Sequence, residues 1–155
     1  MDAKPLRYLA LIPAACACLW LAISSFTYAS AHLNYTRLAA ELSFWSRADY
    51  TPTEATRQQT LAATDQLIRQ HPGYPDYLAL AAYAQYWEWY FTGEQAHSDQ
   101  ALALQQQSLA RRPALGRAWQ TLAEYATTFD NRELAQQAVD SAAALARPAR
   151  YNTGQ

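Results

Sequence analysis

The sequence predicts an all-α protein in which an N-terminal membrane helix is followed by a short array of helical hairpins. Ala fills 33 of the 155 positions, whereas Val occurs once and Ile three times. This bias favours helix over sheet, because β-branched residues are what pleated surfaces prefer. Residues 8–31 carry no charged side chain. Beyond them, Pro and Gly divide the chain into segments of helical length.

Length, charge and cysteine placement limit the classes of function. A chain of 155 residues has room for one modest domain and an anchoring segment. Its 12 basic residues are scattered and are balanced by 13 acidic ones, whereas nucleic-acid binding needs a concentrated positive surface. The two cysteines, Cys16 and Cys18, diverge on one helix and cannot easily bridge. We therefore expect no nucleic-acid partner and a fold that depends on packing alone.

The apolar segment of residues 8–31 is long enough to cross a bilayer, because a transmembrane helix needs about 20 apolar residues. As a signal anchor it would stay in the membrane, with Lys4 and Arg7 holding the N-terminus in the cytoplasm. As a cleavable signal peptide it would be cut after residue 31, where residues 29–31 form an A-x-A site. Both alternatives export the rest of the chain. The length of the segment, and the helical pattern that continues beyond it, favour the anchor.

The chain divides at residues 31, 50 and 150. Residues 1–31 are the signal anchor or cleaved signal peptide, and residues 32–50 are a juxtamembrane helix. Residues 51–150 are the helical domain, and residues 151–155 are a tail. The predicted helices span residues 33–46, 53–70, 76–91, 95–111, 115–128 and 132–147.

Two of these helices have clear start signals. Thr51 and Thr53 around Pro52, followed by Glu54, make a plausible start for the helix of residues 53–70. Asp130 and Asn131 mark the start of the last helix, where a short polar side chain can accept a hydrogen bond from the first turn. Arg147 is favourably placed at the negative end of that helix dipole.

A repeat pattern occupies the end of the domain. Pro113 is followed six positions later by Trp119, and then by Leu122 and Ala123. This spacing resembles the W-x-x-L-G/A signature of the first helix of a tetratricopeptide repeat. Small residues suit its second helix because they allow close approach, and they occur at Ala135 and Ala142.

The same frame fits upstream with poorer residues. Pro72 precedes Leu78 by six positions, and Ala82 follows. The 41 residues between Pro72 and Pro113 exceed the tetratricopeptide period of 34 and indicate an insertion. The resemblance implies stacked hairpins in which large residues of one helix fill alanine-lined holes on the next. The expected repeat core comprises Leu78, Ala82, Trp119, Leu122, Ala123, Ala135 and Ala142.

The stretch "YAQYWEWYF", residues 83–91, has six aromatic residues in nine positions. Four of them follow the i, i+3, i+4, i+7 pattern and share one face of a helix. In the repeat frame this face lies where tetratricopeptide domains line their concave groove, and it would suit an extended peptide or a glycan. The predicted binding residues are Asp76, Tyr83, Tyr86, Trp87 and Tyr90.

A purely structural role for these aromatic residues is the alternative. The face would then be covered by residues 33–46, which supply Leu42, Phe44 and Trp45, or by the helix that begins at Thr53. In an array of so few helices, an aromatic face is difficult to keep exposed in a concave groove.

No reaction centre is apparent in the sequence. His32, His71 and His97 are isolated, with no second metal ligand at helical spacing. Glu88 lies within the aromatic stretch and Glu94 follows it. They could serve as a carboxylate pair, but exposed glutamates at a helix end are ordinary, and we expect both to be exposed. The sequence lacks a phosphate loop and an activated nucleophile. We therefore expect no enzyme activity, metal or cofactor.

A second resemblance covers residues 31–90. The parts that carry it are "AELSFW", the "Y-x-P" start at residues 50–52 and "HPGYPDYL". They are similar to the small VpsP-type proteins of bacterial exopolysaccharide biosynthesis clusters. This resemblance implies a non-catalytic accessory role in making or exporting a surface polysaccharide, with proteins of that assembly as partners. The signal-anchor interpretation adds the location that we expect: the bacterial inner membrane, with the N-terminus cytoplasmic and the C-terminal domain periplasmic.

Two functional hypotheses follow. In the first, the protein is a membrane-anchored helical-repeat adaptor that binds another protein of an envelope assembly. In the second, it is a carbohydrate-binding module that uses Tyr83, Tyr86 and Trp87 on the polysaccharide itself.

Overall fold

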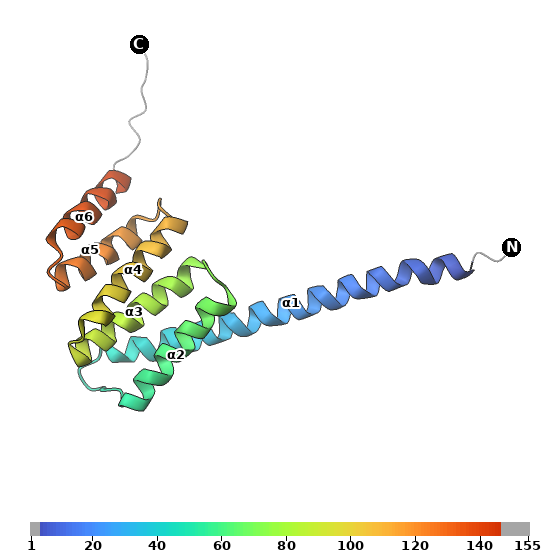
Figure 1. Ribbon diagram of the computed structural model, residues 1–155, viewed down its shortest axis with the longest axis horizontal. Coiled ribbons are helices and arrows are strands. Elements are labelled where there is room, and N and C mark those ends of the chain that lie inside the picture. The colour runs from blue at the N-terminus through green and yellow to red at the C-terminus, as the bar shows by residue number, and fades with distance from the viewer. Residues whose placement is uncertain (1–3, 147–155) are drawn as a thin grey trace, which may run out of the picture. The chain divides into compact units, whose positions relative to one another are not determined.

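The computed structural model describes the backbone of residues 4–146 and the side chains of residues 13–146. Over that range it contains six helices and no strand, which confirms the predicted all-α class (Figure 1). The chain divides into two compact units, Met1–Arg37 and Leu38–Gln155. The helices are α1 (Lys4–Trp45), α2 (Glu54–Gln70), α3 (Pro75–Thr92), α4 (Gln95–Arg111), α5 (Gly116–Thr128) and α6 (Arg132–Ala146).

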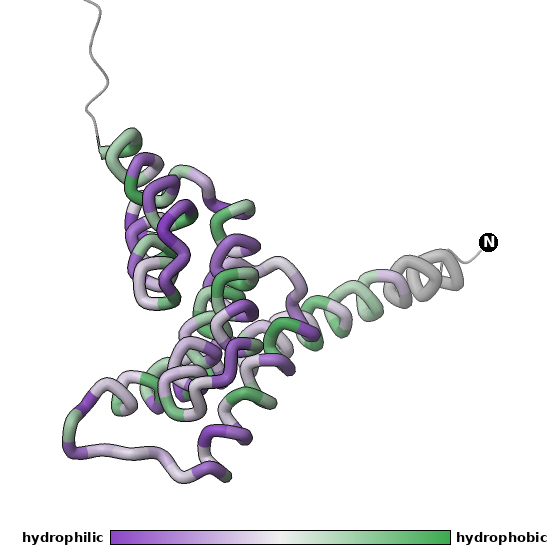
Figure 2. The backbone as a smooth tube through the Cα atoms, turned by 60° about the vertical axis from the view of Figure 1, so that its left-hand side comes forward, coloured by the Kyte–Doolittle hydropathy of each residue, from purple (hydrophilic) through white to green (hydrophobic). Residues whose placement is uncertain are grey.

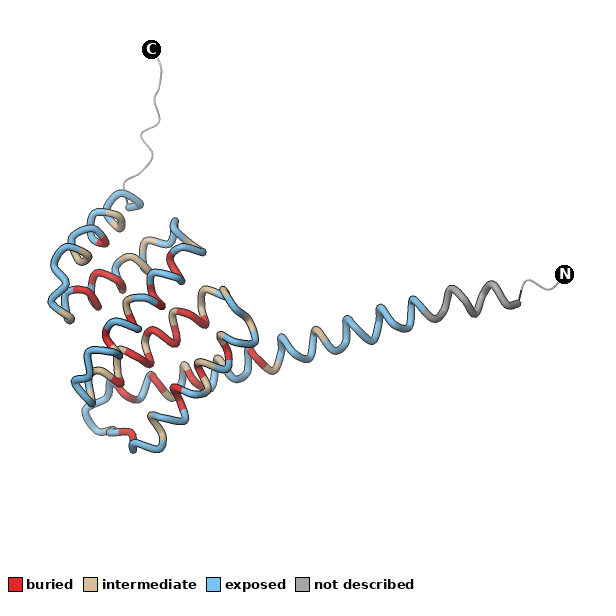
Figure 3. Tube along the Cα trace, in the orientation of Figure 1, coloured by how far each residue is buried: buried red, intermediate tan, exposed pale blue. Residues whose placement is uncertain are grey.

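The first unit consists of the N-terminal part of α1. From Pro13 onward, α1 is long and apolar enough to cross a membrane, a property that a signal sequence near the N-terminus shares. Green and pale colours prevail along this stretch in Figure 2, and Figure 3 shows it largely exposed. Trp20 is 68% and Phe26 is 76% exposed. Such side chains are poorly suited to water and well suited to lipid.

Two polar side chains in this stretch find hydrogen-bond partners within the helix itself. The Thr27 hydroxyl donates to the carbonyl of Ile23 at 2.8 Å, and the Ser30 hydroxyl donates to the carbonyl of Thr27 at 2.9 Å. A membrane-spanning helix requires such internal partners, because hydrocarbon offers none. Residues 8–12 of the predicted span lie outside the described side chains.

The second unit begins with the last two turns of α1 and contains α2 to α6. α3 packs against α4 and α5 against α6, while α2 packs on α3 and α4 on α5 (Figure 1). The observed bounds lie within three residues of the predicted ones for α2 to α6, and those of α4 coincide with them. The predicted helix of residues 33–46 is the end of α1, continuous with the apolar segment as the sequence indicated.

The predicted helix starts are confirmed by their hydrogen bonds. The Thr53 hydroxyl oxygen accepts from the backbone N–H of Thr56 at 3.2 Å. The Asn131 side-chain oxygen accepts from the backbone N–H of Leu134 at 3.2 Å. Both bonds satisfy amide groups that a helix start otherwise leaves unpaired. Arg147 and Pro148 lie outside the described residues.

Two apolar clusters form the core of the hairpins. The first joins α3, α4 and α5 through Leu78, Ala81, Ala82, Ala101, Leu104 and Tyr125, and the second joins α4, α5 and α6 through Leu109, Leu122, Ala123 and Ala138. Figure 3 shows these buried residues on the sides of the helices that face one another. Alanine at so many contact positions lets helix backbones approach closely.

Three of the predicted core residues are less buried than expected. Trp119 is half-buried against the second cluster, and its indole N–H donates to the carbonyl of Pro113 at 2.8 Å. Ala135 and Ala142 are also half-buried. The fully buried alanine of α6 is Ala138, which lies between them and was not predicted.

Candidate functional site

The predicted aromatic binding residues share one side of α3, and two of them, Tyr83 and Tyr86, pack against the first apolar cluster. Leu78 and Ala82 are buried, as predicted for the repeat core, and so are Ala81 and Gln85. Four residues form what we call the aromatic face: Tyr83, Tyr86, Trp87 and Tyr90. Tyr90 is 63% exposed, and the other three are half-buried.

Tyr86 is covered by α5. Its ring stacks on that of Tyr125, with 4.9 Å between centroids and 16° between planes, and on that of Tyr83 at 6.4 Å and 13°. Phe129, at the end of α5, lies 5.8 Å from the same ring. Burial raises the pKa of the Tyr125 phenol, with a smaller contribution from Tyr83, so this hydroxyl stays protonated. From the sequence we considered only residues 33–46 and the helix that begins at Thr53 as covers for this face, and not α5.

Trp87 and Phe91 connect the aromatic face to the end of α1. The Trp87 ring stacks on Phe91 at 5.9 Å, and Trp45 meets Phe91 edge-on at 5.9 Å. As the structural alternative predicted, residues 33–46 therefore help to cover this part of α3, through Trp45. Among the described residues, the buried indole N–H of Trp87 has no hydrogen-bond acceptor. The ring centroid of Trp89 lies 4.8 Å from that of Phe129 at the end of α5.

Asp76 closes the α3–α4 hairpin at its other end. A guanidinium N–H of Arg112 donates to the Asp76 carboxylate at 2.6 Å, and the Ser108 hydroxyl donates to the carbonyl of Pro75 at 2.7 Å. Asp76 lies two helical turns before Tyr83, which is about 10 Å along the axis. The structure does not bring Asp76 to the aromatic face, and its carboxylate is already paired with a cation.

A buried ion pair beside the aromatic face was missed. Glu88 is 1% exposed, so its predicted exposure is wrong, whereas Glu94 is exposed as expected. A Glu88 carboxylate oxygen lies 3.6 Å from the Arg57 guanidinium of α2, and the amide of Gln58 donates to it at 3.5 Å. The guanidinium also lies over the ring of Phe91, 5.2 Å from its centroid.

Helical spacing is the signal that could have identified Glu88. It follows Ala81, Ala84 and Gln85 at intervals of seven, four and three residues, which places it on the buried side of α3. The other Glu88 oxygen has no hydrogen-bond partner within the described part of the chain.

Histidine side chains are dispersed. His97 Nδ1 lies 2.6 Å from the buried Gln85 amide oxygen, and its other ring nitrogen lies 3.6 Å from Glu94. Over the described range there is no group of three His, Cys, Asp or Glu residues that could hold a metal ion.

No protein family, curated protein or solved structure matches the chain. The resemblances to tetratricopeptide repeats and to VpsP-type proteins therefore stay predictions. What the aromatic face offers chemically is ring edges and tyrosine hydroxyl groups, with the exposed Tyr90 at one end. These groups suit reversible binding, because tyrosine presents both apolar area and a polar tip.

Proposed function

We propose that this protein is a non-catalytic, membrane-anchored adaptor of the bacterial envelope that binds a protein partner through its helical hairpins. In this proposal the hairpins are a tetratricopeptide-like array, and the anchor holds them in the periplasm. The assembly served is one for exopolysaccharide biosynthesis or export, as the resemblance to VpsP-type proteins implies.

The observation that carries the proposal is an aromatic face on a hairpin array in a chain with one candidate membrane span. Tyr90 is 63% exposed at the end of that face, and exposed aromatic residues are typical anchors of protein interfaces. A membrane anchor on so small a domain favours a role in holding a partner near the membrane.

The stacking of Tyr86 favours a protein partner over a glycan. Sugars bind aromatic residues through open ring faces, but the Tyr86 ring has Tyr83 and Tyr125 stacked on it. Ring edges and hydroxyl groups are left, and these suit the side chains and amides of a peptide. The glycan alternative rests on Tyr90, whose exposed ring a sugar could also stack on.

Co-purification from native membranes tests the proposal. The 155-residue chain would be isolated in detergent as wild type, Tyr90→Ala and Tyr74→Ala, and associated proteins quantified by mass spectrometry. Tyr74 is the matched control, because it is an exposed tyrosine at the opposite end of α3. We expect a specific envelope protein to be enriched with wild type and Tyr74→Ala and reduced at least about tenfold with Tyr90→Ala, as for an interface anchor worth more than 1 kcal/mol.

A titration with cell-surface polysaccharide, read by tryptophan fluorescence, distinguishes the alternative. Quenching that Tyr90→Ala abolishes, without an enriched protein, would replace the adaptor by a carbohydrate-binding module. Equal enrichment with all three variants would remove the aromatic face from the proposal.

A further inference from the structure

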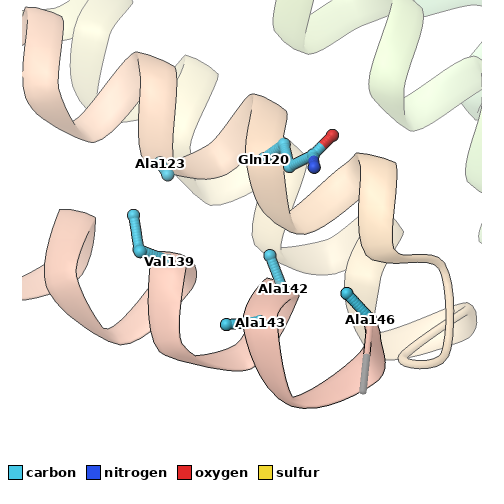
Figure 4. Close-up of a pocket in the computed structure, with 6 residues that line it drawn as sticks. All are labelled: Gln120, Ala123, Val139, Ala142, Ala143 and Ala146. Carbon is cyan, nitrogen blue, oxygen red and sulfur yellow. The ribbon is translucent and has the colours of Figure 1, made fainter. Parts of the chain in front are cut away.

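The last hairpin has an apolar groove on its open side. The groove has a volume of about 400 Å³ and is lined by Gln120 and Ala123 of α5 and by Val139, Ala142, Ala143 and Ala146 of α6. Figure 4 shows Val139, Ala142 and Ala146 directed toward α5 across this groove, with Ala143 beside them on α6. Val139 is 49% exposed, although it is the only valine in the chain.

The preceding hairpin shows what such a surface accepts. On α4, Gln105 and Leu109 are buried by α5: the Gln105 amide donates to the carbonyl of Ala118 at 2.9 Å, and Leu109 packs with Leu122. Val139 follows Gln105 by 34 positions, and Ala143 follows Leu109 by 34 positions. Val139 and Ala143 lie on α6 and line the groove. The positions that receive a helix on α4 are therefore open on α6.

We infer that this groove binds a second copy of the chain, with α6 of one copy packed antiparallel against α6 of the other. The surface suits self-association because one helix carries both the projecting side chain, Val139, and the alanine-lined holes, Ala142 and Ala143. A two-fold interface requires such self-complementarity. Antiparallel packing also sets opposite ends of the two helix dipoles beside each other.

Charge is compatible with this pairing. All six lining residues are uncharged, as is typical of the core of a protein interface. The acidic residues of α6 are held by glutamines of the same helix: Gln137 donates to Glu133 at 3.3 Å, and Gln136 donates to Asp140 at 2.9 Å. The lining of the groove itself contains no carboxylate.

Two neighbouring alanines give a matched test. Ala143 and Ala144 are both exposed on α6, but Ala143 lines the groove and Ala144 does not. The full chain in detergent would be studied as wild type, Ala143→Glu and Ala144→Glu, with its protein mass measured by light scattering. We expect wild type and Ala144→Glu to have twice the monomer mass of 17.4 kDa, and Ala143→Glu to have the monomer mass. Unchanged far-ultraviolet circular dichroism would show that all three are folded.

Crosslinking locates the contact independently of any loss of stability. With Cys16 and Cys18 replaced by serine, Val139→Cys should form a covalent dimer on oxidation, whereas Gln106→Cys, exposed on α4, should not. A monomeric wild type would overturn the inference, since the groove would then belong to another occupant. A dimer that survives Ala143→Glu, or that Ala144→Glu disrupts equally, would also overturn it, because the contact would lie elsewhere.

Discussion

At the scale of single residues, the ion pair of Glu88 and Arg57 is the least ordinary feature of the domain. Their side chains are 2% and 14% exposed, so both charges have lost most of their hydration. Transfer of an ion from water to a protein interior costs several kcal/mol, and an opposite charge recovers this only when the geometry is good. Here the separation is 3.6 Å and one carboxylate oxygen is unpaired among the described residues. The pair therefore fixes how α2 lies on α3 more than it stabilises the fold.

Replacing Glu88, Arg57 or both by methionine should show how little the ion pair stabilises the fold. Glu88→Met leaves the Arg57 cation buried without its partner, and Arg57→Met does the same to the carboxylate. Each single change should lower the free energy of unfolding by about 3 kcal/mol, whereas the double change should stay within about 1 kcal/mol of wild type. Denaturant unfolding of wild type, the two single variants and the double variant in detergent, followed by circular dichroism, gives the free energies of this double-mutant cycle. Additive losses in the double variant would mean that the two charges do not depend on each other.

At the scale of helices, the bounds were predictable because they depend on residues close in sequence. Thr53 and Asn131 start helices through hydrogen bonds that span three residues. α3 ends at Gly93, whose φ of 73° lies in the left-handed region. Residues at such ends act through local backbone geometry, so their effect can be recognised without knowing the fold.

A substitution at Gly93 measures directly how much local backbone geometry at a helix end contributes to stability. A β-carbon at Gly93 would meet no atom within 4 Å, so Gly93→Ala adds backbone strain and no collision. It should lower the free energy of unfolding by about 1 kcal/mol. Gly116→Ala is the matched control, because Gly116 is helical and its added carbon would lie at an ordinary 3.9 Å from Leu145. Gly116→Ala should be neutral or slightly stabilising, and equal losses at both sites would contradict the assignment of strain to Gly93.

The contacts between helices were harder to predict. The structural alternative placed the aromatic face under α1 or α2, yet Tyr125 and Phe129 of α5 cover Tyr86. The periodicity of α3 identifies which side chains share a face, but not which helix meets that face, because the meeting depends on packing angles set elsewhere in the array. Ala138 was missed for the same reason: Ala135, Ala138 and Ala142 share one face of α6, and their burial depends on where α5 crosses it.

At the scale of the whole molecule, the continuity of α1 joins the candidate membrane span to the second unit. The helix runs without interruption from Lys4 to Trp45, so the apolar segment leads directly into the residues that are buried in the second unit, Leu38, Leu42 and Trp45.

The same continuity bears on whether the N-terminal segment is removed. Residues 29–31, the A-x-A site, are helical, and the Ser30 hydroxyl donates to the carbonyl of Thr27 at 2.9 Å. Cleavage after residue 31 would require this part of α1 to unwind, and the helix extends for 14 more residues beyond it, which favours the helical state through cooperativity. Expressed as the 155-residue chain, the protein should therefore keep its full mass of 17.4 kDa and stay with the membrane after an alkaline carbonate wash. Intact-mass spectrometry of the membrane fraction measures both properties, with a variant carrying Ala29→Leu and Ala31→Leu, which cannot be cut at this site, as the reference. A wild-type protein that begins at His32 and leaves the membrane, while the reference stays, would identify residues 1–31 as a signal peptide and would remove the anchor from the proposed function.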